Sequence, residues 1–404
     1  MINIYAQHLL SSLSSVQCDP LTLGSVPDAR GTATQSPTLC HPITADPSTH
    51  TMGFVLHHYV FPKIHTVIQT HDFSSILVVG AYTRSPPAFI TENEKGNKPF
   101  NWQRPTATIF HTPESKILQL NVLPGRAYVE HYAALLATYF ARKALTGARI
   151  PTVHYVPPAP DACAPLLAAS NLPYLGRIDV AILGYVDKLP GCMGPEGWET
   201  GMDQGAEGDA LFAWKKRILR DGRCVAFVGC TACYWGDIGG QLIRALQVHN
   251  GAREAIYIGK LGTLDPRHLP NSVLATGSCS MFPDGSVVEW ENILESAVQG
   301  VRGVVSGVHF TGATSLSETK EWAREWRDKV DWVDPEIGHM AKVSLEEGIR
   351  FGFLHVVSDN LSREGLEGLV DERKATIVAD RMKLLEVVDS VLERYFNESD
   401  KNGN

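Results

Sequence analysis

Strand-length apolar runs and helix-length amphipathic runs alternate along most of the chain. Between Phe54 and Leu145, three short runs rich in aliphatic and β-branched residues precede one long stretch rich in Ala and Leu. Short runs of this kind are typical of buried strands, and the longer stretch is typical of a helix. The predicted strands are 75–80, 106–110 and 116–123, and the predicted helix is 127–145.

The second half of the chain repeats this alternation more regularly. A buried strand is expected from Arg177, and from Arg223 onward strand, helix and strand segments succeed one another. Such alternation predicts a mixed or mostly parallel sheet that is covered by helices on both faces. Residues 191–208 interrupt it with many glycines and no periodicity, which is typical of a loop that can act as a lid.

Residues 1–50 form the other exception to the alternation. From position 11 onward this segment is rich in Ser, Thr, Pro and Asp and poor in large apolar side chains, so it predicts an irregular N-terminal arm. Such an arm can wrap around a second copy of the chain, and a homo-oligomer is expected. The remainder, 51–404, is expected to fold as one α/β domain.

Two carboxylates lie where α/β proteins usually place their chemistry. Asp334 can cap a helix that begins at Pro335 and carries Glu336 in its first turn. The following apolar segment, 349–357, is short enough for a strand and ends at Ser-Asp-Asn, so Asp359 is expected on a loop at the strand's carboxyl end. By themselves, these positions also suit plainer roles: a helix-dipole contact for Glu336 and an Asx turn for Asp359.

The motifs around these carboxylates resemble those of the nucleoside phosphorylase-I superfamily, which contains purine and uridine phosphorylases and nucleosidases. Its members have V-E-M-E at the start of the helix and S-D at the end of the strand, where this chain has V-D-P-E and V-S-D-N. Glu336 and Asp359 are 23 positions apart, the spacing of the hexameric-type purine phosphorylases. D-E-R-K-A-T around Arg373 and A-I-Y-I-G-K-L-G-T-L resemble further family segments. The resemblance is clearest over 221–404 and implies a three-layer α/β/α fold with a central mixed sheet, with 51–170 as a divergent or added α/β portion.

The resemblance also implies roles for individual residues. Glu336 would bind the 2′ and 3′ hydroxyls of a ribose, and Asp359 would be the general acid that protonates the departing base. Arg373 would stabilise the carboxylate that remains. The implied substrate contacts are Glu336, Pro335, Phe310 and Ser358. Phe310 lies in the region of an aromatic that stacks on the base, and ordinary core packing beside the neighbouring tryptophans is its alternative role.

The nucleophile site departs from the family pattern. Where the family has a phosphate-binding Arg, this chain has Tyr257, and Lys260 follows Gly259 in place of Ser or Thr. Gly259 and Lys260 would lie beside the nucleophile or a substrate phosphate. Arg126, in a loop that loosely resembles the family's first phosphate loop, would be a second anion ligand. Three functions stay open: a phosphorylase, a nucleosidase that uses water, and a nucleoside- or nucleotide-binding module without catalysis.

Composition argues against several other classes of protein. The 404 residues carry a net charge of −8 and contain no block of Lys and Arg, which argues against a nucleic-acid binder. No apolar run reaches the length of a membrane span, and no Lys or Arg precedes Arg30, so neither a signal peptide nor a transit peptide is indicated. A cytoplasmic location is expected, and the eight scattered cysteines suit a reducing compartment.

No cofactor and no metal are expected. The histidines at 57, 58, 65 and 71 lack an H-E-x-x-H pattern and cysteine partners, so solvated or core histidines are favoured over a metal site. Cys230 and Cys233 have the spacing of a redox pair but not the surroundings of one. The expected partner is a small-molecule nucleoside or nucleotide, with inorganic phosphate as co-substrate if the enzyme is a phosphorylase.

Overall fold

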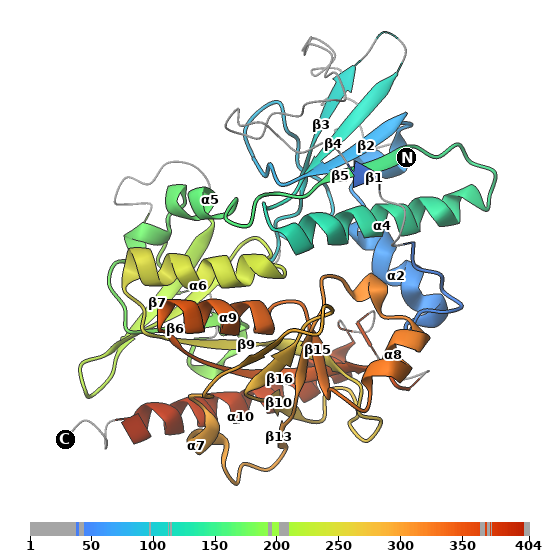
Figure 1. The fold of residues 1–404 in the computed structure, drawn as a ribbon. Coiled ribbons are helices and arrows are strands. Elements are labelled where there is room, and N and C mark those ends of the chain that lie inside the picture. Colours follow the sequence, from blue (N-terminus) through green and yellow to red (C-terminus); the bar gives the residue numbers. More distant parts are fainter. Residues whose placement is uncertain are drawn as a thin grey trace.

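The computed structural model divides the chain between two β-sheets (Figure 1). It describes residues 38–39, 44–96, 98–111, 113, 115–192, 196–201, 210–363, 368–369, 372 and 374–399. The smaller sheet uses residues before 157, and the larger one uses residues from 180 onward. We refer to the two halves of the molecule as the small unit and the large unit.

The smaller sheet has five strands in the order β1-β5-β2-β4-β3. Their bounds are β1 (Thr38–Leu39), β2 (Ser75–Val79), β3 (Thr106–His111), β4 (Lys116–Asn121) and β5 (Thr152–Val156). β2 runs parallel to both of its neighbours, and β1 and β3 close the two edges in the antiparallel sense. All five residues of β2 are buried, as expected for the central strand of a covered sheet.

One long helix and several short ones belong to the small unit. Their bounds are η1 (Gly53–Val55), α2 (Leu56–Val60), η2 (Phe61–Lys63), α3 (Thr66–Thr70) and α4 (Arg126–Ala144). Helix α4 connects β4 to β5, packs on the sheet, and carries α2 against its side (Figure 1). This arrangement places the N-terminus of α4 at the carboxyl end of β4.

The larger sheet has eleven strands, and its centre is parallel. There β8, β6, β9 and β16 lie side by side and run in one direction. The bounds are β6 (Val180–Gly184), β7 (Phe212–Ile218), β8 (Cys224–Cys230), β9 (Glu254–Thr263), β10 (Leu274–Thr276), β11 (Cys279–Met281), β12 (Val287–Glu289), β13 (Val304–Ser306), β14 (His309–Thr311), β15 (Trp332–Asp334) and β16 (Arg350–Asn360).

Helices cover both faces of the larger sheet, which gives the expected three-layer α/β/α arrangement (Figure 1). They are α5 (Ala164–Ala169), η3 (Leu172–Leu175), η4 (Val186–Lys188), η5 (Pro190–Cys192), α6 (Asp237–Asn250), α7 (Glu295–Val298), η7 (Ser315–Ser317), α8 (Lys320–Trp326), α9 (Ile337–Glu347) and α10 (Ala375–Ser399). Successive side chains of a strand point to opposite faces. Ala255 and Tyr257 of β9 therefore pack with residues of α6 and α9, and Ile256 and Ile258 pack with residues of α10. Among the described helices, none is both long and apolar enough to cross a membrane.

The predicted strands and helices are confirmed, with two changes of boundary near the carboxylates. Helix α9 begins at Ile337 rather than at Pro335. The expectation that Asp359 follows the strand on a loop is wrong, because β16 continues beyond it. The reason is tertiary: Asp359 pairs with Gly262 of the neighbouring strand β9.

The two irregular segments are only partly described. Of the predicted arm, 1–37 and 40–43 lie outside the described residues, and Thr38–Leu39 form β1. The end of the arm contacts the large unit, because the ring of His50 lies 2.9 Å from the carbonyl oxygen of Ser315. Of the predicted loop, 193–195 and 202–208 lie outside the described residues.

The two units meet where α4 and α6 begin. The carboxylate of Asp237, at the start of α6, accepts hydrogen bonds from the backbone N–H groups of Arg126 and Ala127, both 2.9 Å long. A Cβ on Gly125 would lie 2.3 Å from Cγ1 of Ile238, so only glycine allows this approach. Asp237 therefore caps a helix of the other unit.

Replacing Asp237 by Ala should lower the free energy of unfolding by about 1–2 kcal/mol, because two N–H groups of α4 lose their acceptor. Chemical denaturation of the variant and the native protein measures this difference. Asp284→Ala is the matched control, since the exposed Asp284 bonds only to the nearby Ser286. Equal losses for both variants would contradict a capping role for Asp237.

Candidate active site

Glu336 is held at the start of α9 by the residues before it. The Oδ1 atom of Asp334 accepts hydrogen bonds from the N–H groups of Glu336 and Ile337, both 2.9 Å long, which confirms the predicted cap. Asp334 itself lies between two fully buried histidines, 3.1 Å from Nε2 of His309 and 3.6 Å from Nε2 of His355. This buried group fixes the backbone that carries Glu336.

The carboxyl group of Glu336 faces the loop before α6 and the adjacent strand β9. Its Oε1 accepts a hydrogen bond of 3.3 Å from the N–H of Gly236, and its Oε2 accepts one of 3.4 Å from the hydroxyl of Tyr257. Burial, and then the negative charge of Asp334, raise the pKa of Glu336 well above its ordinary value. Because both bonds are at the long end of the normal range, a ligand hydroxyl can compete for this carboxyl group.

Asp359 lies at an irregularity near the end of β16. The pairing with β9 shifts by one residue between Val357 and Asp359, which is the pattern of a β-bulge at Ser358. Bulges often redirect side chains beside active sites. The hydroxyl of Ser358 is 2.6 Å from Oδ1 of Asp359, and burial is the main cause that raises the pKa of Asp359. Since the side chain of Asp359 is only partly buried, its carboxyl group can hold a proton and still reach a ligand.

Lys260 lies on β9 beside Asp359. Its ammonium group forms an ion pair with Glu372, and 29% of its side chain is accessible to solvent. Desolvation, followed by the positive charge of Arg381, nevertheless lowers the pKa of Lys260 to about 7. Lys260 therefore keeps contact with solvent although it has lost part of its hydration.

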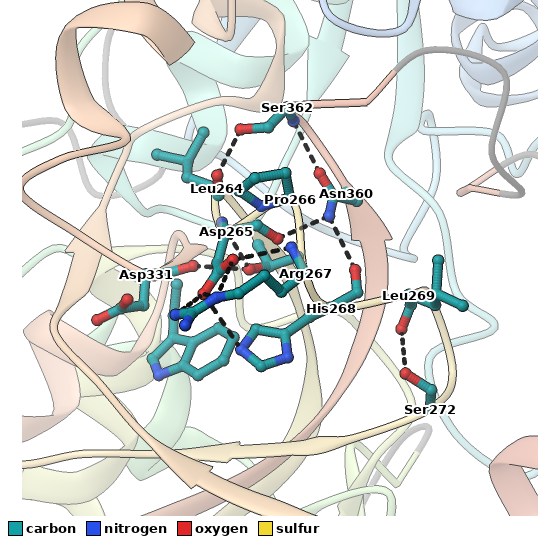
Figure 2. Close-up of polar contacts among 12 residues, drawn as sticks. Leu264, Asp265, Pro266, Arg267, His268, Leu269, Ser272, Asp331, Asn360 and Ser362 are labelled. Atoms are coloured by element: carbon teal, nitrogen blue, oxygen red, sulfur yellow. Dashed lines mark hydrogen bonds and ion pairs between the residues drawn. The ribbon is translucent and has the colours of Figure 1, made fainter.

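A network of hydrogen bonds locks the carboxyl ends of β9 and β16 together (Figure 2). The side-chain amide of Asn360 donates to the carbonyl oxygens of Asp265 and His268, both at 2.8 Å. Its Oδ1 accepts from the N–H of Ser362, whose hydroxyl donates to the carbonyl oxygen of Leu264. The network fixes the ends of the two strands that carry Asp359 and Lys260.

The structure brings some of the predicted site residues together. Glu336 and Asp359 share Lys260 as a charged neighbour, because its positive charge opposes the upward pKa shift of both carboxyl groups. Ser358 touches Asp359, and Pro335 is partly buried beside Glu336. β15 runs antiparallel to β9, so the chain after it turns back along β9, and Glu336 contacts Tyr257 in the middle of that strand, whereas Asp359 pairs near its carboxyl end.

The remaining predicted residues are less directly connected to this site. Gly259 packs directly on the ring of His355. A Cβ added to Gly259 would lie 2.7 Å from Nε2 of His355. Phe310 is buried against Trp326, with ring centres 4.5 Å apart, so its alternative role in the core agrees with its packing. Arg126 is exposed, and its N–H is already bound by Asp237. Arg373 lies outside the described residues. Their predicted contacts with a ligand stay predictions.

Sequence reasoning missed two contributions to the site. Tyr257 was noted only as a departure from a family pattern, whereas its hydroxyl donates to Glu336. Lys63 and Arg104, from the small unit, act electrostatically on the loop residue Cys233, as Glu336 and Lys260 also do. No local pattern marks these two cations, because only the contact between the units brings them near the carboxylates.

Comparisons with known proteins do not assign the chain to a family. No family model matches it. MTAN of Helicobacter pylori matches with a TM-score of 0.42 and 13% identity over 55% of this chain and 99% of that one. Purine nucleoside phosphorylase of Toxoplasma gondii, in complex with immucillin-H, matches with a TM-score of 0.43 and 13% identity over 55% and 93%. The 5′-methylthioadenosine/S-adenosyl homocysteine nucleosidase of Campylobacter jejuni matches with a TM-score of 0.43 and 11% identity over 54% and 98%.

These matches include nucleosidases as well as a phosphorylase, so they do not single out the hexameric-type purine phosphorylases. Among curated proteins, the oxidoreductase cns1 of Cordyceps militaris is 27% identical over 210 residues, which are 49% of this chain. The chain covers only 25% of the length of that relative. Scores at this level carry no argument about chemistry, which has to come from the side chains of the site.

Proposed function

We propose that this protein cleaves the N-glycosidic bond of a nucleoside or nucleotide. The observation that supports this best is the pair of carboxyl groups Glu336 and Asp359, which both have raised pKa values and both interact with the charge of Lys260. They differ in surroundings: Glu336 is bound by two protein donors, and Asp359 is partly accessible. Such a difference suits one group that binds substrate and one that transfers a proton.

In this mechanism the bond between C1′ of the ribose and the base nitrogen breaks, and its electron pair leaves with the base. Asp359 donates its proton to a nitrogen of the base as negative charge develops there. The carboxylate that remains is stabilised by the positive charges of Lys260 and Arg381. Glu336 accepts hydrogen bonds from the ribose hydroxyls. Phosphate, or water that loses a proton to solvent, then forms the new bond to C1′ of the oxocarbenium-like sugar.

The test is a panel of nucleosides and nucleoside monophosphates incubated with the protein, with and without inorganic phosphate. Base release that needs phosphate identifies a phosphorylase, and release without phosphate identifies a hydrolase. No release from any member of the panel refutes the proposal. Ligand-induced thermal stabilisation in that case would instead identify a binding module.

Anion binding at Lys260 should weaken as the pH rises. With a pKa of about 7, its amine loses charge between pH 6 and pH 8, so affinity should fall by up to about tenfold over this range. Sulfate is the suitable probe, because its own charge is constant there, and calorimetry measures the affinity. The charged and titratable groups that interact with Lys260 are Asp359, Glu336, Glu372, Arg381, Lys63, Lys95, Lys98 and Cys233.

Lys260→Arg supplies the control for this experiment, because a guanidinium keeps its charge throughout. The pKa of Lys63 is also lowered, so the variant should reduce the pH dependence rather than abolish it. The nearby His355 has a pKa of about 4 and gains no charge in this range. An unchanged native affinity from pH 6 to pH 8 would mean that the ion pair with Glu372 keeps Lys260 charged.

A further inference from the structure

Three consecutive residues that lead into α6 lie against the first turns of α4 in the small unit. The indole of Trp235 stacks on the imidazole of His131, with ring centres 4.1 Å apart and an angle of 18° between the planes. A Cβ on Gly236 would lie 2.4 Å from Cβ of Ala127. Asp237 accepts the two hydrogen bonds from α4 described above. Helix α4 therefore contacts this loop at each of the three positions.

The middle residue of the three, Gly236, is also the one that contacts Glu336. Its N–H donates to Oε1 of Glu336 at 3.3 Å. Its backbone has a φ of 62° and a ψ of −129°, a conformation that favours glycine. The peptide bond between Trp235 and Gly236 is planar, so its N–H turns together with the carbonyl group of Trp235. The contacts of Trp235 therefore control the direction in which this donor points.

Both units fix the side chain of Trp235. Its Nε1 donates to the carbonyl oxygen of Ala313 at 2.9 Å, and its ring also stacks on that of Tyr128, with centres 6.4 Å apart and planes 21° apart. Nδ1 of His131 lies 2.8 Å from the hydroxyl of Thr314, the residue after Ala313. The indole and the imidazole that stacks on it are thus bound to neighbouring residues of one segment. This closed set of contacts joins α4, the loop before α6 and the segment before η7.

His131 is a buried histidine that the proposed reaction does not use, with 2% of its surface accessible to solvent. Burial, and then the positive charge of Lys63, lower the pKa of His131 well below its ordinary value, so the ring is neutral at physiological pH. A neutral imidazole offers Trp235 a flat aromatic surface, while its Nδ1 is bound to Thr314. The stack and the hydrogen bond can therefore be removed separately by substitution.

We propose that His131 is a positioning residue for Glu336, which acts through the stacked indole of Trp235 and the N–H of Gly236. The small unit then takes part in recognition of the sugar, because the contact that orients the carboxyl group of Glu336 depends on α4. This inference rests on the proposed function for its effect on a substrate. The hydrogen bond between Gly236 and Glu336 is tested without it.

The kinetic test compares His131→Gln, which removes the ring but can still bind Thr314, with His131→Phe, which keeps a ring and loses that hydrogen bond. In His131→Gln, the KM of a ribo substrate should rise by about threefold to tenfold, as expected when one hydrogen bond of ordinary strength is lost. The KM of the 2′-deoxy substrate should change by less than about twofold. His131→Phe should keep the native ratio of the two KM values.

His65→Gln is the matched control for these variants. His65 is also buried in the small unit, but its ring contacts Phe89 of that unit, with centres 5.3 Å apart. The control should leave the ratio of the two KM values unchanged, even if it lowers the stability of the protein. An equal rise of both KM values in His131→Gln would overturn the inference, and so would a change of their ratio in His131→Phe as large as that in His131→Gln.

Hydrogen–deuterium exchange of the Gly236 amide tests the same inference without a substrate. Relative to the amides of α10, on the other face of the sheet, it should be about tenfold faster in His131→Gln and within about threefold of native in His131→Phe and His65→Gln. Trp235→Leu, which removes the other ring of the stack, serves if His131→Gln does not fold. Unchanged exchange at Gly236 would overturn the inference even if base is released. The expected exchange without base release from any substrate would support the positioning and refute only the proposed reaction.

Discussion

Asp359→Asn should lower kcat by about 10²-fold to 10⁴-fold, with little change in the affinity for substrate. The amide has the shape of the acid but cannot donate a proton to the departing base. Ribose binding should persist, because Glu336 belongs to a different element, the start of α9. Turnover of the best substrate in the panel, measured under saturating conditions, gives the comparison.

The pH dependence should change together with the rate. The pKa of Asp359 is raised, chiefly by burial, so its acid form persists above the ordinary range of a carboxyl group. Activity should be full below this pKa and fall as the pH rises through it, and Asp359→Asn should lack that fall. Glu318→Gln is the control, since Glu318 is another partly buried carboxyl group close enough for the charge of Asp359 to act on it. A similar loss of turnover in Glu318→Gln would assign the effect to local charge and not to proton transfer.

Glu336→Gln should raise the KM of a ribonucleoside or ribonucleotide by about 10-fold to 100-fold and lower kcat as well, because the contact with the sugar hydroxyls is replaced by a weaker one. The penalty should be much smaller for the 2′-deoxy substrate, which lacks one of the partners. Steady-state constants of the native protein and the variant, each measured on both substrates, complete a thermodynamic cycle. The cycle isolates the contact between Glu336 and the 2′ hydroxyl.

Tyr257→Phe gives the appropriate comparison for this second experiment. It removes the 3.4 Å hydrogen bond to Glu336 but keeps the carboxyl group, so the loss should be smaller and should show the same dependence on the 2′ hydroxyl. If Glu336→Gln penalises ribo and deoxyribo substrates equally, Glu336 does not touch the sugar. Glu336 would then serve only the local structure at the start of α9.

Local interactions explain which elements the sequence could predict. Strands β2, β3, β4 and β6 and helix α4 follow from the period of their apolar residues, which depends only on neighbours along the chain. The cap of α9 is equally local, since the Asp334 carboxylate binds N–H groups two and three residues later. The position of Asp359 near the carboxyl end of a strand also follows from the sequence, whereas the direction of β15, which is antiparallel to β9, does not.

The tertiary structure alone decided how the site is completed. The extension of β16 past Val357 depends on its pairing with β9 and on the bonds of Asn360 to a loop more than 90 positions away. The contact between Tyr257 and Glu336 joins residues 79 positions apart. Sequence periodicity carries no information about such pairs, because they meet only when separate elements pack. The same reason applies to the contact between the two units: the sequence determined that Asp237 is charged, and the packing of α6 beside α4 determined that it caps α4.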